Sequence, residues 1–200
     1  MSAKLDAVNV MLKAIGETPV SSLSSGLADA AQAEATLDTV KRRILAKGWT
    51  VNTDNDVTFN PDVNQEIRVA DTVLRIDTSD EQRFIDVVIR VDPNDQLRKL
   101  FDKREQSFQF TRSLKCDVIY DYEFDELDFD LQQYIAAQAA RKFQEETMGS
   151  VALDKFLVRA EGEAWASFQD AEAEAEDVNT ITDSPHVRAI TFRNSRLRGF

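Results

Sequence analysis

The chain has 200 residues, of which 42% are hydrophobic and 30% are charged, and its formal net charge at pH 7 is −12. This length and composition predict a soluble globular protein with one large domain, or one domain with an insert. The charge argues against nucleic-acid binding through the whole surface, because such binding needs lysine and arginine to displace counterions from the phosphates.

Two further features concern the compartment in which the protein works. No apolar run approaches the roughly 18–20 residues that a membrane-spanning helix needs. The N-terminal stretch contains Asp6 and Lys13 and does not resemble a signal peptide. We therefore expect the protein to work where it is made, or in a particle assembled there.

With a single cysteine, Cys116, an internal disulfide is impossible. The strand pattern around this cysteine favours a buried structural thiol.

The first 48 residues predict two helices. Ser2 can cap the first, whose apolar positions are Leu5, Val8, Leu12 and Ile15, and Gly16 ends it. The second runs from about Ala28 to Lys47, with Gly48 suited to the left-handed position after its end. Its last turns hold four cations, which can offset the helix dipole: Lys41, Arg42, Arg43 and Lys47. We favour this structural role over phosphate binding.

The middle of the chain, residues 49–123, has the pattern of short strands separated by polar turns. Asp54-Asn55 and the stretch from Asp92 to Asp95 are turn signals. No helical pattern intervenes, which favours antiparallel pairing over βαβ units. The predicted strands are Trp49–Asn52, Val57–Phe59, Ile67–Ile76, Arg83–Val91, Leu97–Phe101, Ser107–Phe110 and Lys115–Tyr122.

Two longer helices follow, separated by a break at residues 148–150. Apolar residues at i, i+3 and i+4 predict one buried stripe on each. The stripe of the first contains Leu131, Tyr134, Ile135, Gln138, Ala139 and Phe143. That of the second contains Leu153, Phe156, Leu157, Ala160, Ala164 and Phe168, and we expect Trp165 to lie in the core as well. The predicted class is α+β: residues 1–48 and 124–178 form a helical bundle, 49–123 form an antiparallel β insert, and 179–200 form an extended C-terminal arm.

The C-terminal arm differs from the rest of this acidic chain. After Asp183 it has no acidic residue, whereas Asp170 to Asp177 hold five carboxylates in eight positions. The arm could be a solvated tail. Alternatively it docks on another subunit, through Phe192, Leu197 and Phe200 as apolar anchors and Arg188, Arg193, Arg196 and Arg198 as pairing groups. The residues alone leave both alternatives open.

No arrangement of residues predicts catalysis, and no cofactor or metal site is expected. The single histidine, His186, lies in the arm, and the six glycines form no phosphate-binding loop. Asp121, Glu123 and Asp125 imitate the start of a calcium loop, but Glu126 replaces the required glycine. The acidic run from 117 to 130 fits a solvated strand face and a helix N-terminus, although a glycosidase pair of carboxylates stays open.

Four motifs stand out along the chain. The first is Ala7-Val8-Asn9-x-x-Leu12-x-x-Ile15-Gly16-Glu17-x-Pro19-Val20-Ser21-x-Leu23. The others are Gly48-Trp49-Thr50, Phe124-Asp125-Glu126-Leu127 and Tyr134-Ile135-x-x-x-Ala139-Ala140-Arg141-x-Phe143-Gln144. Together they resemble the tail tubular protein A family. The resemblance covers roughly residues 5 to 178, with the β middle similar in pattern rather than in letters.

The resemblance implies a virion structural protein rather than an enzyme. Family members are head-to-tail adaptors of short-tailed phages related to T7. They form a ring, taken to be twelve copies, that connects the portal protein ring to the tail nozzle protein and leaves a channel for genomic DNA. Two alternatives of other classes remain: a carboxylate-based glycan hydrolase of the cell envelope, and a generic protein-binding module.

Overall fold

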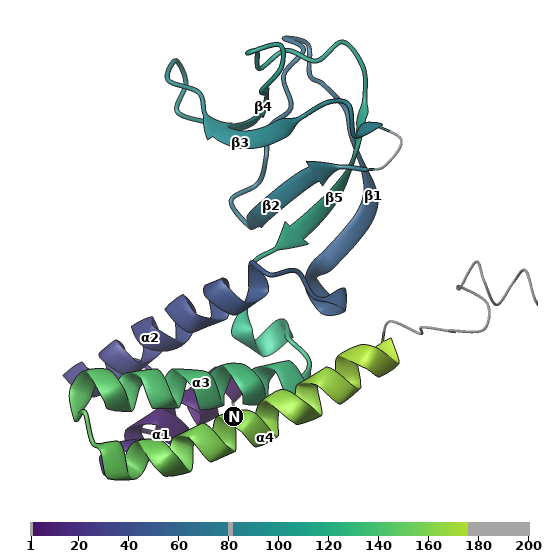
Figure 1. Cartoon of the computed structure of the whole chain (residues 1–200). Coiled ribbons are helices and arrows are strands. Elements are labelled where there is room, and N and C mark those ends of the chain that lie inside the picture. The colour runs from purple at the N-terminus through teal and green to yellow at the C-terminus, as the bar shows by residue number, and fades with distance from the viewer. Residues whose placement is uncertain (1, 80–81, 176–200) are drawn as a thin grey trace, which may run out of the picture.

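In the computed structural model, which describes residues 2–79 and 82–175, a helical part supports a β part (Figure 1). The predicted α+β class is confirmed. The helices are α1 (Ala3–Ala14), α2 (Ala28–Leu45), α3 (Phe129–Thr147) and α4 (Val151–Ala175). The helices from the two ends of the chain pack together as expected, and the β part projects from them.

The helical part is built around the apolar faces of α1, α2 and α3. Val8, Leu37 and Ile135, one from each helix, are completely buried in one hydrophobic cluster. The stripe predicted for residues 131–143 is confirmed except at Gln138, which is only half-buried: Leu131, Tyr134, Ile135, Ala139 and Phe143 are all buried. The N-terminus of α1 is capped differently from the prediction: the Ser2 side chain does not cap it, and the carboxylate of Asp125 takes that place.

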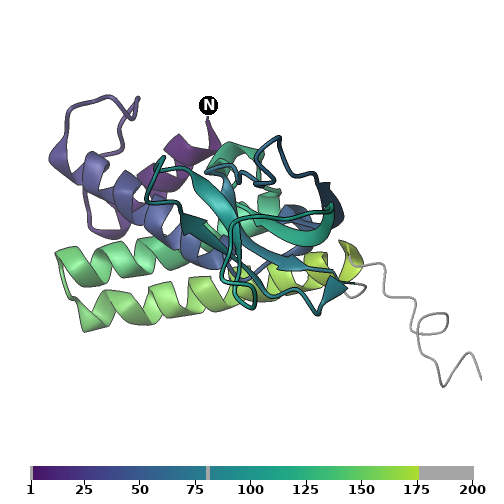
Figure 2. The same ribbon diagram turned by 90° about the horizontal axis from the view of Figure 1, so that it is seen from above.

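α4 lies antiparallel beside α3 along its length (Figures 1 and 2), but only its C-terminal half packs as predicted. Phe168 is the only buried side chain of this helix. Its ring contacts those of Trp49, Tyr134 and Trp165, at centroid distances of 4.8, 5.9 and 6.0 Å. The predicted core position of Trp165 is thus confirmed, although its side chain is only half-buried.

The N-terminal half of α4 contradicts the prediction. Phe156 is 75% exposed and Leu153 is 37% exposed, although both belong to the predicted stripe. The apolar spacing correctly indicated a helix with one apolar face. No other element of the described residues covers that face between Val151 and Phe156.

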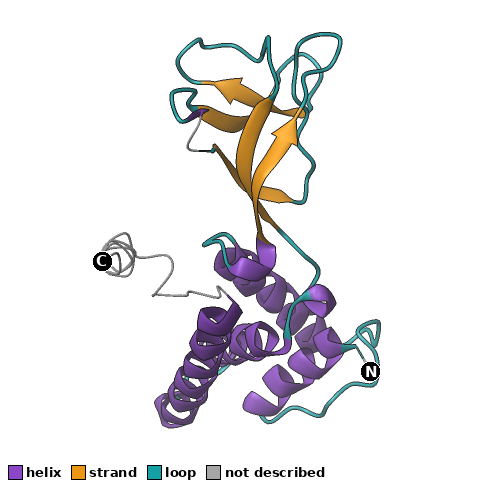
Figure 3. Cartoon of the chain, turned by 90° about the vertical axis from the view of Figure 1, so that its right-hand side faces the viewer, coloured by secondary structure: helices purple, strands orange, loops and turns teal. Residues whose placement is uncertain are grey.

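The β part contains two antiparallel sheets, drawn in orange above the helices in Figure 3. The strands are β1 (Thr53–Phe59), β2 (Val73–Thr78), β3 (Val87–Val91), β4 (Arg98–Asp102) and β5 (Leu114–Tyr120). One sheet has the order β1-β5-β2, and β3 pairs with β4 in the other. A second hydrophobic cluster, with Leu100, Leu114 and Val118 completely buried, fills the space between them.

Several strand predictions were wrong in their bounds or type. Residues 49–52 do not form a strand: Thr50–Asn52 is a 3-10 turn, and Asp54-Asn55 lies inside β1 beside a bulge rather than in a turn. The strand predicted over 67–76 forms only from Val73, because a turn closes between the carbonyl of Ala70 and the amide of Val73. Residues 107–110 make isolated bridges only. The turn predicted after Val91 is confirmed.

The chain passes between the two parts twice, and buried polar side chains join the crossings. Asn52, which is 1% exposed, donates from Nδ2 to the carbonyls of Leu45 and Tyr120 at 3.0 and 2.7 Å. Its Oδ1 accepts the backbone N–H of Trp49 at 2.9 Å. Lys41 Nζ donates to the carbonyl of Tyr122 at 2.7 Å. These bonds tie the end of α2 to the end of β5.

Candidate functional site

The residues that the sequence proposed as a binding site lie outside the described part of the chain. They are Arg188, Phe192, Arg193, Arg196, Leu197, Arg198 and Phe200. The single histidine, His186, also lies beyond residue 175. The surfaces of residues 2–79 and 82–175 therefore supply the observations on function.

The acidic run from 117 to 130 is used mainly to build the fold. Asp117 Oδ1 accepts the amide of Asp56 at the β1 bulge, and Asp121 pairs with Lys41 at 3.1 Å. Asp125 accepts from Ser2 Oγ and from the amide of Lys4, and these hydrogen bonds hold its pKa below the ordinary value. Asp128 caps α3 in the same way, by accepting the amide of Leu131.

These contacts bear on the glycosidase alternative. A catalytic pair needs two carboxyl groups that face one substrate, one of them with a raised pKa. Asp117, Asp121, Asp125 and Asp128 instead each hold a different part of the chain together. The geometry gives the glycan hydrolase no support.

The cations at the end of α2 also have partners within the chain, which goes beyond the dipole role predicted for them. Lys41 is 5% exposed and joins α2 to Asp121 and Tyr122, and Arg42 pairs with Asp121 at 3.0 Å. Arg43 donates to Gln138 of α3 at 2.8 Å. The cluster therefore anchors α2 to its neighbours.

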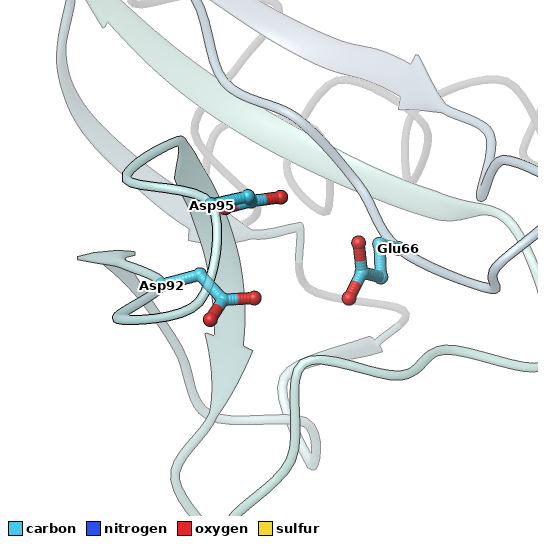
Figure 4. A group of neighbouring side chains, drawn as sticks. All are labelled: Glu66, Asp92 and Asp95. Atoms are coloured by element: carbon cyan, nitrogen blue, oxygen red, sulfur yellow. The ribbon is translucent and has the colours of Figure 1, made fainter.

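In the β part, three carboxylates surround one buried ammonium. Glu66, Asp92 and Asp95 place carboxylate oxygens within 4.8 Å of one another, which is metal-ligand spacing (Figure 4). Lys99, only 2% exposed, places Nζ 2.7 Å from Glu66, 2.7 Å from Asp92 and 2.6 Å from Asp95. Because an ammonium has three donors, Lys99 satisfies all three carboxylates.

The titration of this cluster follows from its geometry. Burial alone would lower the pKa of Lys99, but its hydrogen bonds to Asp92, Asp95 and Glu66 prevail and raise it. The same bonds lower the pKa values of Asp92 and Asp95. The lysine thus remains charged and acts as the internal counter-ion, so a metal ion would have to displace it. The cluster stabilises the loop after β3 rather than forming a metal centre.

Cys116 is completely buried in β5. Burial, with smaller contributions from Asp117 and Asp77, raises the pKa of its thiol to about 12. Because the thiolate is the reactive form, this cysteine is inert at neutral pH. The predicted structural thiol is confirmed.

A groove of about 400 Å³ lies between α1, α3 and α4, and the sequence reasoning missed it. Seven of its fourteen lining residues are alanine, so small side chains leave the space between the helices open. Phe129 and Val10 are 69% and 48% exposed at its walls. Asp6 is the one charged side chain in the lining. The alanines of α3 and α4 at helical spacing were the available signal.

A wider hollow of about 540 Å³ opens among the loops of the β part. It is lined by both charged and apolar side chains, and the guanidinium of Arg112 lies 5.0 Å from the ring centroid of Phe84. Arg104 and Glu105 bring both signs of charge to its lining. This mixed lining is typical of a contact surface rather than of a catalytic pocket.

Comparison with known families adds a decisive observation. A family model described as Tube, tail tubular protein, matches residues 5–178. The chain belongs to the tail tubular protein family. The matched range includes both the helical part and the β part, so membership concerns the whole described fold. No curated protein sequence matches the chain.

Membership in the tail tubular family indicates a structural role in a phage tail. This role agrees with two observations: apolar side chains are exposed on the helices, and the buried charges pair with one another within the fold. In addition, none of the helices in residues 2–79 and 82–175 has the length and apolar character needed to cross a membrane.

Proposed function

We propose that this tail tubular protein is a head-to-tail adaptor of the A type, from a short-tailed phage related to T7. Twelve copies form a ring beneath the portal, join it to the tail nozzle protein, and leave a channel through which DNA leaves the head. The ring is assembled in the host cytoplasm and remains in the virion. The family match over residues 5–178 is the observation that carries this proposal.

The proposal assigns the parts of the chain to separate tasks. Residues 1–48 and 124–178 form the unit that builds the ring, residues 49–123 form an inserted β unit, and residues 179–200 form an arm. Two separate hydrophobic clusters, one among the helices and one among the strands, support this division.

Ring contacts are proposed at the uncovered end of the α3–α4 pair. Met148, Val151 and Phe156 are 53%, 75% and 75% exposed there. A soluble subunit rarely exposes several large apolar side chains together unless they meet a partner. A ring requires head-to-tail contacts that close by rotation, so this apolar end would pack against a different surface of the next copy.

The arm is proposed to strengthen attachment to the portal or to the neighbouring copy. Its anchors are Phe192, Leu197 and Phe200, and its pairing groups are Arg188, Arg193, Arg196 and Arg198. Arginine pairs well with carboxylates at interfaces because its planar group donates two parallel hydrogen bonds. Deletion of Pro185–Phe200 should leave a folded subunit that attaches more weakly. Unchanged assembly by the truncated protein would refute this role.

The net charge of −12 suits a channel for DNA, because a negative lumen does not grip the phosphate backbone. Asp170 and Glu174 on the last turns of α4 are exposed acids available for this purpose. DNA would pass without sequence-specific binding. A reconstruction in which the carboxylates of residues 170–177 or of residues 117–130 all lie on the exterior of the ring would refute this part of the proposal.

Electron microscopy of the protein mixed with its candidate portal ring tests the whole function. The expected result is a new layer of density on one end of the portal, with the symmetry of the portal. The protein alone and the portal alone serve as controls. Absence of binding by a well-folded protein would refute the adaptor function.

A further inference from the structure

The groove between α1, α3 and α4 has the features of a binding site for an apolar, basic segment. Its walls are formed by alanines and by the exposed side chains of Val10 and Phe129. Asp6 is the charged group of the lining, and no basic side chain among residues 2–79 and 82–175 forms an ion pair with it. An occupant with large apolar side chains and an arginine would therefore match the groove in both properties.

The chain itself contains such a segment. Residues 184–200 have no acidic residue, and Arg193 and Arg196 alternate there with Phe192 and Leu197. We propose that, in the free subunit, residues 192–198 dock into the groove of the same molecule. This self-docking shields Val10 and Phe129 from water until a partner displaces the segment. The inference goes beyond the adaptor function and does not depend on a ring.

The length of the intervening chain supports docking within one molecule. Ala160, in the groove lining, lies fifteen residues before Ala175, which is about 22 Å along the helix. Residues 176–191 supply sixteen residues, and a flexible chain of that length has a root-mean-square span of about 20–24 Å. A tether whose span matches the distance to its site gives the highest effective concentration, of the order of millimolar. At micromolar protein, docking onto a second copy competes poorly.

A disulfide-trapping experiment tests this on the full chain with a matched pair of variants. Ser195→Cys is combined either with Ala160→Cys, in the groove, or with Ala166→Cys, which is exposed and lies about 9 Å along the same helix and about 120° around its axis. Both partners are alanines on α4, six residues apart. The native Cys116 is completely buried and stays out of the exchange.

Each variant is oxidised mildly at low micromolar concentration, and the products are separated on non-reducing gels and identified by peptide mass. We expect the intrachain disulfide to form at least about tenfold faster at position 160 than at position 166, because docking raises the local concentration of Ser195→Cys. Adding Phe192→Asp and Leu197→Asp should abolish this difference without affecting the described fold, since both residues lie outside it.

Two results would overturn the proposal. Equal rates at the two positions would show that residues 192–198 do not prefer the groove. A disulfide-linked dimer as the main product at position 160 would show that the segment occupies the groove of another copy instead. Neither result depends on portal binding, so the outcome is independent of the adaptor function.

Discussion

Phe168 should be the side chain on which the attachment of α4 depends most. It is completely buried, and it is the only residue of the helix that is. Replacing a buried phenylalanine with alanine costs about 3–5 kcal/mol, from the lost transfer free energy and the cavity that remains. In a protein of this size each kcal/mol lowers Tm by about 2–4 °C, so Phe168→Ala should lower Tm by roughly 6–20 °C.

Phe156→Ala provides the control on the same helix. Phe156 is 75% exposed, so its truncation should change the free energy of unfolding by no more than about 0.5 kcal/mol. Both variants would be unfolded in urea and followed by circular dichroism and by tryptophan fluorescence. The only two tryptophans, Trp49 and Trp165, contact Phe168, so fluorescence reports on this cluster directly.

For Phe168→Ala we expect the fluorescence transition at lower urea than the circular dichroism transition, because α4 separates before the other helices unfold. Equal stability losses in Phe168→Ala and Phe156→Ala would refute the reasoning. Such a result would mean that the aromatic cluster around Phe168 does not hold the C-terminal half of α4 in place.

Three further predictions concern the β part and its junction with the helices. Lys99→Met should lower Tm at pH 7 by leaving three carboxylates without their counter-ion. The lowered pKa of Asp92 means that its stabilisation is present above about pH 4 and lost as the pH falls through the lowered pKa. The Tm difference between Lys99→Met and the parent protein should therefore shrink from pH 7 to pH 3, and a constant difference would contradict this. Asn52→Ala should cost about 1–3 kcal/mol in urea unfolding, since it leaves buried backbone groups without partners. Gly48→Ala should destabilise the fold more than Gly16→Ala. Both glycines have a positive φ, of +80° and +82°, so the backbone strain is the same. Only at Gly48 would the added Cβ also lie 2.7 Å from the Ile119 side chain.

The helices could be predicted well because their signals are local. The apolar spacing of residues 131–143 and the glycine at position 48 depend only on neighbouring residues, and both predictions are confirmed. The same spacing on α4 could not tell which residues find a partner within the chain. Phe156 and Phe168 have equal hydrophobicity and are linked by i, i+4 steps, but over twelve residues these steps drift by about 120° around the helix axis. One side chain is exposed and the other is buried.

Strand bounds and buried charges were harder to predict because they depend on distant residues. Ile67 resembles a strand residue, but its backbone pairs only with the segment around Leu100, through one hydrogen bond and the isolated bridge between Arg68 and Lys99. Likewise, nothing near Lys99 in the sequence indicates that Glu66 completes its set of partners. The groove depends on how three helices meet, and therefore could not be located from any one of them.

The two crossings between the parts have a mechanical consequence. β1 and β5 begin and end at these crossings and are hydrogen-bonded to each other, so the β part has a double stem rather than a single flexible connection. Asn52 and Lys41 clamp the base of that stem. Two hydrogen-bonded strands resist bending and twisting better than a single connection would, so the β part is held stiffly on the helices. A force applied to its distant loops would therefore be transmitted to the end of α2 and to the aromatic cluster of Trp49, Trp165 and Phe168.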